Sequence, residues 1–374
     1  MMTLSDALST IAKLAPLLRV EAIAADRETQ FPELSVKALR EAGLFAAGIP
    51  TEYGGLGFTP AELAEVAAAI GECCGSTAMI FAMHQLQVGC LTMGTASLEI
   101  TEFLRRAARE QLLVASVTSE EGIGGDMRRS DAALRPDLTF TKRASTISYG
   151  AQADALLVTL RRDENAEQHD QVLVLAHSSQ VTLTPTGSWN TMGMRGTCSP
   201  GFQVDAAVRA QQVLPLPFAQ IASGCMVPLS HLLWSAVWTG IAADAVRRAA
   251  LLVRRKAHAM GHSDPRLAAA HAQLSLLRAA VAQFAAQYHG PDVEISESVT
   301  VAANALKLTV SMQAVQVVER ALEICGVPGY QETGDYSVAR HLRDLYSARL
   351  MIANTKLEQA NAELLLLTGT GASS

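Results

Sequence analysis

Apolar residues recur every three or four positions over most of the first 111 residues. The segments SDALSTIAKLAPLLRVEAIAADRE and TPAELAEVAAAIGECCG show this spacing, which places apolar side chains on one face of a helix. Thr59 to Glu62 resembles a capping box at the start of the second segment. Between the two lies GIPTEYGGLGF, whose glycines and proline favour turns. The pattern predicts an N-terminal helical domain over residues 1–111.

The pattern changes at about residue 112. Short runs rich in β-branched residues, such as LLVASVT, DALLVTLRR and DQVLVLAH, are separated by glycine, aspartate and asparagine. They predict a small central β-barrel-like domain over residues 112–225. Long alanine-rich helical patterns then return, and their short breaks predict an antiparallel four-helix bundle over residues 226–374. The expected fold class is α+β and mostly α.

Composition and charge exclude several functions. The chain has 374 residues, enough for two or three domains, with a net charge of −6 and a pI near 5.9. This balance provides no basic surface for nucleic acid or an anionic membrane. No uninterrupted apolar run reaches about 18 residues, and the N-terminus lacks a signal-peptide pattern. We therefore expect a cytoplasmic protein without nucleic-acid or membrane partners.

The six cysteines show neither zinc-ligand spacing nor a short disulfide framework. We expect them to be reduced packing residues, and we expect no metal site. A more informative stretch is TSEEGIGGD, Thr118 to Asp126. Its glycines are typical of a phosphate-binding loop, but its two adjacent glutamates would repel a phosphate. The loop must therefore serve another ligand or another part of one.

Five stretches, in order, resemble segments of the acyl-CoA dehydrogenase superfamily of flavoproteins. They are PTEYGGLGF, VTSEEGIGGD, STISYGAQADALLV, MGMRGT, and EICGVPGY followed by RHLRD. The resemblance covers nearly the whole chain. It implies a bound flavin, a small acyl substrate, an electron acceptor or reductase as partner, and a homodimer or homotetramer assembled through the helical bundle.

The resemblance also implies which residues contact the flavin. The positions that match the family's flavin contacts are Ser116, Thr118, Ser119, Gly124, Gly125, Thr146, Ser148, Lys256, Glu323, Gly326 and Thr355. Lys256 replaces an arginine and Glu323 replaces a glutamine that hold the adenine end of flavin adenine dinucleotide (FAD) in the family. A carboxylate near a pyrophosphate is unfavourable. FAD is therefore the expected cofactor, with flavin mononucleotide (FMN) as the alternative.

The family's catalytic base is the clearest departure. Dehydrogenation of an acyl thioester removes an α-proton, which requires a general base. The position that matches the family's glutamate is Ala353, which cannot accept a proton. The candidates for a relocated base are Glu120, Glu358 and Asp344. The candidate substrate contacts are His84, Trp189 and Arg195, and His84 is also a candidate catalytic hydrogen-bond donor.

Three functions remain open at this point. The first is oxidation of an acyl thioester, bound to coenzyme A or a carrier protein, at Cα–Cβ with hydride transfer to flavin N5. The second is a monooxygenase of the same fold, which receives reduced flavin from a reductase and needs no glutamate at position 353. The third is a non-catalytic flavin-binding or assembly subunit. We rank dehydrogenation slightly first because the flavin-edge loop stays dehydrogenase-like.

Overall fold

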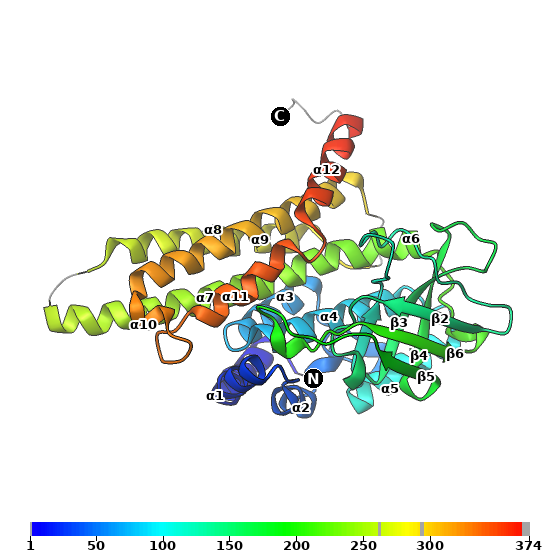
Figure 1. Cartoon of the computed structure of the whole chain (residues 1–374), viewed down its shortest axis with the longest axis horizontal. Coiled ribbons are helices and arrows are strands. Elements are labelled where there is room, and N and C mark those ends of the chain that lie inside the picture. The colour runs from blue at the N-terminus through cyan, green and yellow to red at the C-terminus, as the bar shows by residue number, and fades with distance from the viewer. Residues whose placement is uncertain (1, 261–262, 292–294, 369–374) are drawn as a thin grey trace.

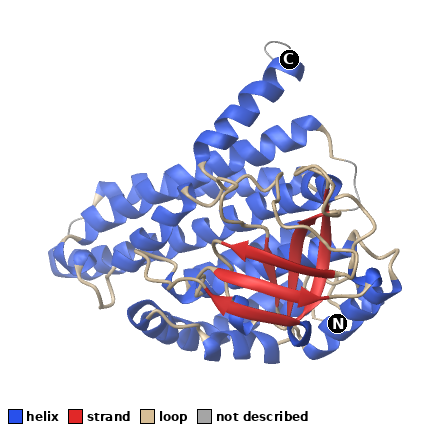
Figure 2. Cartoon of the chain, turned by 45° about the vertical axis from the view of Figure 1, so that its right-hand side comes forward, coloured by secondary structure: helices blue, strands red, loops and turns tan. Residues whose placement is uncertain are grey.

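The computed structural model describes residues 2–260, 263–291 and 295–368. Helices dominate, and the strands gather on one side of the molecule with helices around them (Figures 1 and 2). The predicted mostly helical α+β fold is confirmed. The domain boundaries at residues 111 and 225 stay predictions.

The N-terminal part is helical, as its periodicity predicts. Its helices are α1 (Leu4–Glu28), α2 (Glu33–Glu41), α3 (Pro60–Gly71), α4 (Gly75–Thr92) and α5 (Leu98–Glu110). The predicted capping box of α3 is present, because Thr59 Oγ1 accepts from the Glu62 amide and the Glu62 carboxylate accepts from the Thr59 amide. Helix α4 is buried on nearly every side, which explains why its sequence lacks an amphipathic pattern.

The central part forms two three-stranded sheets rather than one continuous barrel. The first has the order β1 (Val114–Val117), β3 (Ala155–Arg161) and β4 (Gln171–His177), and the second has the order β2 (Thr139–Ala144), β6 (Phe202–Ala207) and β5 (Val181–Pro185). Strand β1 runs parallel to β3, with Val114 opposite Ala155, and the other pairs are antiparallel. Strands β3 and β4 are buried on both faces, which agrees with their continuous apolar runs.

The C-terminal part contains the long helices. They are α7 (Val227–Met260), α8 (Pro265–Gln287) and α9 (Glu297–Cys325), with the shorter α6 (Phe218–Ile221), α10 (Val327–Tyr330), α11 (Ala339–Tyr346) and α12 (Asn354–Thr368). Helix α7 packs against α3 at very short range. A Cβ atom at Gly240 would lie 2.2 Å from the Ala68 carbonyl oxygen, so only glycine allows this approach.

Two helical segments are long and apolar enough to cross a membrane by length and composition alone. They span Phe218–Ala257 and Glu297–Cys325, and 94% and 56% of their most apolar windows are buried inside the molecule. The first segment is therefore a core helix of this fold, and neither segment is by itself good evidence for a membrane span.

A buried carboxylate joins α7 to α11. Asp244 is 1% exposed and accepts hydrogen bonds from Arg247 Nε at 2.8 Å, Arg248 Nε at 2.7 Å and His341 Nε2 at 2.8 Å. Burial opposes ionisation of Asp244, but His341 and Arg248 outweigh it and lower the pKa of the carboxyl group. The ionised form of Asp244 therefore contributes to the stability of the fold.

We predict that Asp244→Asn lowers the free energy of unfolding by about 3 kcal/mol at pH 7, because it removes the buried anion that accepts hydrogen bonds from Arg247, Arg248 and His341. The folded-state pKa of Asp244 lies below 3.8, so this contribution is complete above pH 3.8 and shrinks as the pH falls below that value. Urea denaturation at pH 7 and at pH 3.5 measures both effects.

The matched control is Glu72→Gln, the same chemical change in a partly exposed pair with Arg278. It is expected to change stability by no more than about 0.5 kcal/mol. A deficit in Asp244→Asn that is no larger than this, or that grows at low pH, would contradict the assignment.

Candidate functional site

Two loops of the central part meet through Ser119. Its hydroxyl group donates to the Thr146 carbonyl at 2.6 Å and accepts from the Thr146 amide at 3.1 Å. The first loop continues β1, and the second follows β2 and carries Ser148. This pair of hydrogen bonds fixes the two predicted flavin-edge stretches side by side.

The hydroxyl groups near this junction are partly accessible. Ser116, Thr118 and Ser148 are half-buried, and Thr146 is exposed. The oxygens of Ser116 and Thr118 lie 3.5 Å apart on one face of β1. Ser148 Oγ accepts from Ser199 Oγ at 2.9 Å and keeps its own hydrogen for another acceptor. The surface thus offers short hydroxyl donors of the kind that suits the polar edge of an isoalloxazine ring.

The glycine loop lies beside the start of α12. Gly122, Gly124 and Gly125 have φ values of 88°, 63° and 70°, a left-handed region that favours glycine. The Lys356 ammonium donates to the Gly124 carbonyl, and a Cβ atom at Gly125 would lie 3.7 Å from Lys356 Nζ. The structure therefore adds a cation, missed in the sequence, beside this loop. These groups fit a flavin with at least one phosphate.

Three predicted cofactor residues lie elsewhere. Lys256, Glu323 and Gly326 are exposed near the ends of α7 and α9, where α10 begins (Figure 1). The Glu323 carbonyl accepts from Arg266 Nη1 at 3.2 Å, which ties this end to the start of α8. The chain thus carries two separate groups of predicted cofactor residues, one beside the sheets and one at the far end of the bundle.

The structure argues against Glu120 as a catalytic base. Its side chain is buried and lies 3.3 Å from Lys142 Nζ. Its oxygens also accept from Ser130 Oγ at 2.7 Å and from the Ala132 amide at 2.7 Å. Burial lowers the pKa of Lys142 to about 8, although the Glu120 charge opposes this shift. These contacts hold the loop after β1 in place, and a catalytic role for Glu120 stays a prediction that they disfavour.

His84 is likewise structural. It is fully buried, Nε2 donates to the Phe45 carbonyl at 2.8 Å, and Nδ1 accepts from the Val114 amide at 3.1 Å. Burial lowers the pKa of His84 to about 4, so the ring is neutral. Both nitrogens are occupied by backbone groups. His84 thus joins α4 to β1, and its donation to a substrate or oxygen stays a prediction that these contacts disfavour.

The MGMRGT turn is fastened to α11 and α1. The Met194 amide donates to Asp344 Oδ1 at 2.6 Å, and Trp189 Nε1 donates to the Met194 carbonyl at 3.2 Å. Arg195 Nε donates to the Asp26 carbonyl at 2.6 Å. Burial raises the pKa of Asp344 to about 6. The side chains of Asp344, Trp189 and Arg195 thus each have a structural partner in this turn or beside it. Substrate contacts by Trp189 and Arg195 stay predictions.

Ala353 occupies the position of the family's catalytic glutamate. The side chain that contacts this segment is a lysine, Lys307. Lys307 Nζ on α9 donates to the Ile352 carbonyl and to Asn354 Oδ1, each at 2.6 Å. These residues flank Ala353. Glu358 and Thr355 are exposed on the first turns of α12. Among the described residues, no carboxylate is hydrogen-bonded to or ion-paired with positions 352–354.

Sequence reasoning missed Lys307, although a signal was present. Ala303, Val310 and Ala314 are buried on α9 at spacings of −4, +3 and +7 from this lysine. A lysine within such an apolar stripe must lose its hydration, and burial lowers the pKa of Lys307 to about 8.

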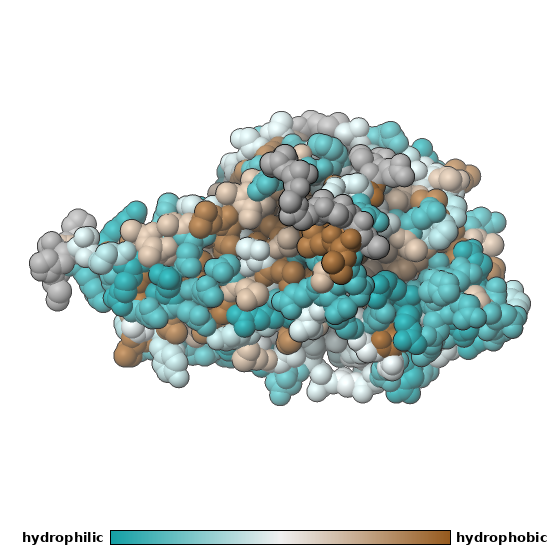
Figure 3. Space-filling model, turned by 90° about the horizontal axis from the view of Figure 1, so that it is seen from above, coloured by the Kyte–Doolittle hydropathy of each residue, from teal (hydrophilic) through white to brown (hydrophobic). Residues whose placement is uncertain are grey.

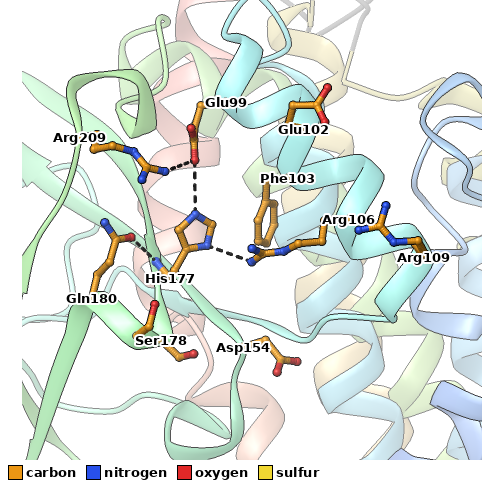
Figure 4. Close-up of a pocket in the computed structure, with 11 residues that line it drawn as sticks. Glu99, Glu102, Phe103, Arg106, Arg109, Asp154, His177, Ser178, Gln180 and Arg209 are labelled. Carbon is orange, nitrogen blue, oxygen red and sulfur yellow. Dashed lines mark hydrogen bonds and ion pairs between the residues drawn. The ribbon is translucent and has the colours of Figure 1, made fainter.

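A pocket of about 480 Å³ lies on another side of the sheet (Figure 4). Asp154 lines it and accepts from the Leu113 amide, which precedes β1, whereas Thr118 follows β1. The pocket is therefore at the opposite end of this strand from the hydroxyl groups. None of the predicted site residues lines it.

The charges of this pocket compensate one another. The His177 ring lies between Glu99 and Arg106, and Arg209 also pairs with Glu99 (Figure 4). Asp154 pairs with Arg40 at 3.0 Å. Burial lowers the pKa of His177, so its neutral ring accepts from Arg106 and points Nε2 at Glu99. This network explains how α5 attaches to the sheet.

Comparison with known proteins agrees with this geometry. Residues 12–111 match the acyl-CoA dehydrogenase N-terminal domain and residues 230–352 match the acyl-CoA dehydrogenase C-terminal domain. The amino sugar nitrososynthase DnmZ of Streptomyces peucetius is 25% identical over 366 residues, covering 92% of this chain and 88% of DnmZ.

Solved structures share the fold. FMN-bound TdsC, the dibenzothiophene monooxygenase of Paenibacillus sp. A11-2, has a TM-score of 0.84 at 22% identity and 97% coverage of both chains. Butyryl-CoA dehydrogenase of Megasphaera elsdenii has a TM-score of 0.82 at 20% identity, covering 97% of this chain and 98% of that one. These relatives make a flavin, FAD or FMN, the cofactor of the fold. The chain belongs to the acyl-CoA dehydrogenase superfamily of flavoproteins.

Proposed function

We propose that this protein is a flavin-dependent monooxygenase that uses reduced flavin supplied by a reductase and oxygenates a small molecule. The observation that carries this proposal is the composition of the segment around Ala353. Its polar contacts come from Lys307, Asn354 and Ser311, and no described carboxylate contacts it. This reverses the ranking that the sequence alone favours.

The chemical reason is the need for a base. Dehydrogenation at Cα–Cβ removes a proton from carbon, and an alanine cannot accept it. Glu120 is held in an ion pair, and Glu358 is exposed. A bound reduced flavin supplies the electrons with which one oxygen atom of O₂ enters the substrate and the other leaves as water. For this reaction the chain must bind and orient the flavin edge, and we assign this role to Ser148 and the glycine loop, beside the junction that Ser119 forms.

The relative DnmZ also favours a reaction other than acyl-thioester dehydrogenation. DnmZ aligns with 92% of this chain, and its name denotes formation of a nitroso group on an amino sugar rather than oxidation of an acyl thioester. The identity of the substrate of the present protein is a separate question, and the acyl substrate expected from the sequence is the alternative.

Acyl-thioester dehydrogenation is the second candidate. It is favoured by the flavin-edge loops, where Thr118 and Ser119 keep the residue types of the dehydrogenases and the two loops are joined as one unit. A non-catalytic subunit ranks third, because the partly accessible hydroxyl groups beside the glycine loop suit a functional cofactor edge.

We also propose that the protein is a homo-oligomer. One group of cofactor residues lies beside the sheets and the other at the far end of the bundle, so a second copy is needed to bring both to one FAD. Seen from above, apolar residues gather on a face of the bundle (Figure 3). Exposed apolar side chains of the bundle include Leu251, Leu276, Met312, Leu350 and Leu366. Such surfaces mark protein interfaces.

We predict that the protein, mixed with chemically reduced FMN or FAD under air, transfers labelled oxygen from ¹⁸O₂ into an amine, sulfur or aromatic substrate of a test panel. Mass spectrometry of the product measures the label. The protein with oxidised FAD and an acyl-CoA panel without oxygen should show no loss of flavin absorbance. Bleaching of FAD by an acyl-CoA, with no label transfer, would establish the dehydrogenase instead.

We predict that Ser148→Ala weakens flavin binding about fivefold to tenfold, because one hydroxyl hydrogen bond to the ring edge is lost. Fluorescence titration of the apoprotein with FMN and FAD gives the Kd values. Thr184→Ala, which removes an exposed hydroxyl group on β5, is the control and should leave Kd unchanged. Equal Kd values for all three proteins would place the flavin edge elsewhere.

A further inference from the structure

The Lys307 ammonium is a buried cation without a counter-ion. Lys307 is 0% exposed, and Nζ donates to two neutral oxygens of the described residues, the Ile352 carbonyl and Asn354 Oδ1. No carboxylate of the described residues lies within ion-pair distance of it. Buried lysines are normally paired, because transfer of a charge from water is costly. An uncompensated cation at this place therefore needs an explanation beyond packing.

The groups facing Lys307 do not supply a negative charge. From α7, His231 is fully buried, and burial together with the Lys307 charge lowers the pKa of its ring to about 3. His231 is thus neutral, although the Ala303 carbonyl opposes this lowering of its pKa. From α12, the polar neighbour is Asn354, which also exchanges hydrogen bonds with Ser311. Among the described residues of this cluster, Lys307 is the group whose proton equilibrium lies nearest neutral pH.

The segment that Lys307 holds is strained. Ile352 has φ +54°, a left-handed conformation that β-branched residues rarely adopt because their side chains crowd the backbone. Such strain costs on the order of 1–3 kcal/mol and persists only where surrounding contacts impose it. The contact made here is the hydrogen bond from Lys307 Nζ to the carbonyl of the strained residue itself.

This contact continues toward the glycine loop. Ile352 and Asn354 flank Ala353, and α12 begins at Asn354. Two residues later, Lys356 donates to the Gly124 carbonyl. A displacement of positions 352–354 would therefore move the first turn of α12 and change its contact with the loop that fits the flavin.

We propose that Lys307 replaces the family's carboxylate as the titratable group of the reaction site, where it acts as a positioning residue that holds Ile352–Asn354 in a strained arrangement beside the flavin loop. This inference rests on the proposed function for its meaning in catalysis. The contacts of protonated Lys307 with Ile352 and Asn354, called the clamp below, hold the start of α12. This part of the proposal does not depend on which reaction the flavin performs.

The clamp predicts a particular pH dependence. Burial lowers the pKa of Lys307 to about 8 from 10.5, so the ammonium form dominates below about pH 8 and the neutral amine above it. The amine is a weaker donor to Ile352 and Asn354 than the ammonium. Flavin affinity and turnover should therefore both decline as the pH rises through about 8.

The experiment compares the wild-type protein with Lys307→Met, which keeps an unbranched side chain that is one atom shorter and removes the charge. Flavin Kd is measured by fluorescence titration from pH 6.5 to 9.5, and kcat is measured over the same range. We expect a wild-type inflection near pH 8 that Lys307→Met lacks, and a kcat for the variant that is at least about tenfold lower below that pH.

Two further variants separate positioning from packing. Ser311→Ala removes a neutral contact with Asn354 and should retain the inflection. Ile352→Gly relieves the positive φ and, combined with Lys307→Met, should restore part of the lost flavin affinity. Thermal unfolding supplies a readout without activity: because the folded-state pKa of Lys307 is lowered, wild-type stability relative to Lys307→Met should rise between about pH 8 and 10.5.

An inflection in flavin affinity that persists in Lys307→Met, with only a lower melting temperature, would overturn the proposal and leave Lys307 a packing residue. If no substrate of the panel is oxygenated, the proposed function fails, but the flavin titration and the thermal data still decide the role of Lys307. Loss of the inflection in both Lys307→Met and Ser311→Ala would also overturn it, since removal of a neutral contact would then have the same effect as removal of the charge.

Discussion

The fold depends on the burial of α7. Residues 228–246 of this helix are buried on every side, and α3, α4, α8 and α9 pack against it and exclude water from this part. Gly240 shows how tightly the cover fits, since α3 and α7 approach at a distance that no side chain would permit. Because the helices that enclose α7 come from both ends of the sequence, the flanking helical parts cannot form independent cores. The sheets then attach at one side of this common core, where the hydroxyl groups and α12 meet.

Much of this arrangement could be predicted from local patterns. Helical periodicity, β-branched runs and the Thr59 capping box each depend on neighbours in sequence, and each is found where the pattern places it. The matching of motifs identified the loops that meet at Ser119. The division of the strands into two sheets was not predictable in the same way, since strand pairing between β1 and β3 joins residues about forty positions apart through contacts that periodicity does not encode.

The chemistry of single side chains was harder to predict, for a related reason. Glu120 and His84 are polar residues at plausible positions, but their partners, Lys142, Phe45 and Val114, lie in distant segments. A titratable residue in a sequence motif shows only what it could do in water. Whether it is free to react depends on which distant groups occupy its lone pairs and hydrogens. Lys307 shows the reverse case, because its apolar surroundings were visible in the sequence whereas its contact with Ile352 was not.

The two hydrogen bonds of Ser119 have a consequence for the cofactor cycle. They join the loop after β1 to the loop after β2 through groups of the chain itself. A protein that exchanges its flavin with a partner at each turnover loses affinity whenever a binding surface must be ordered anew. Here the hydrogen bonds of Ser119 order the two loops, so flavin binding carries a smaller entropic cost of ordering them. Rapid loading and release of a loosely held flavin thus become compatible with an accurately oriented ring.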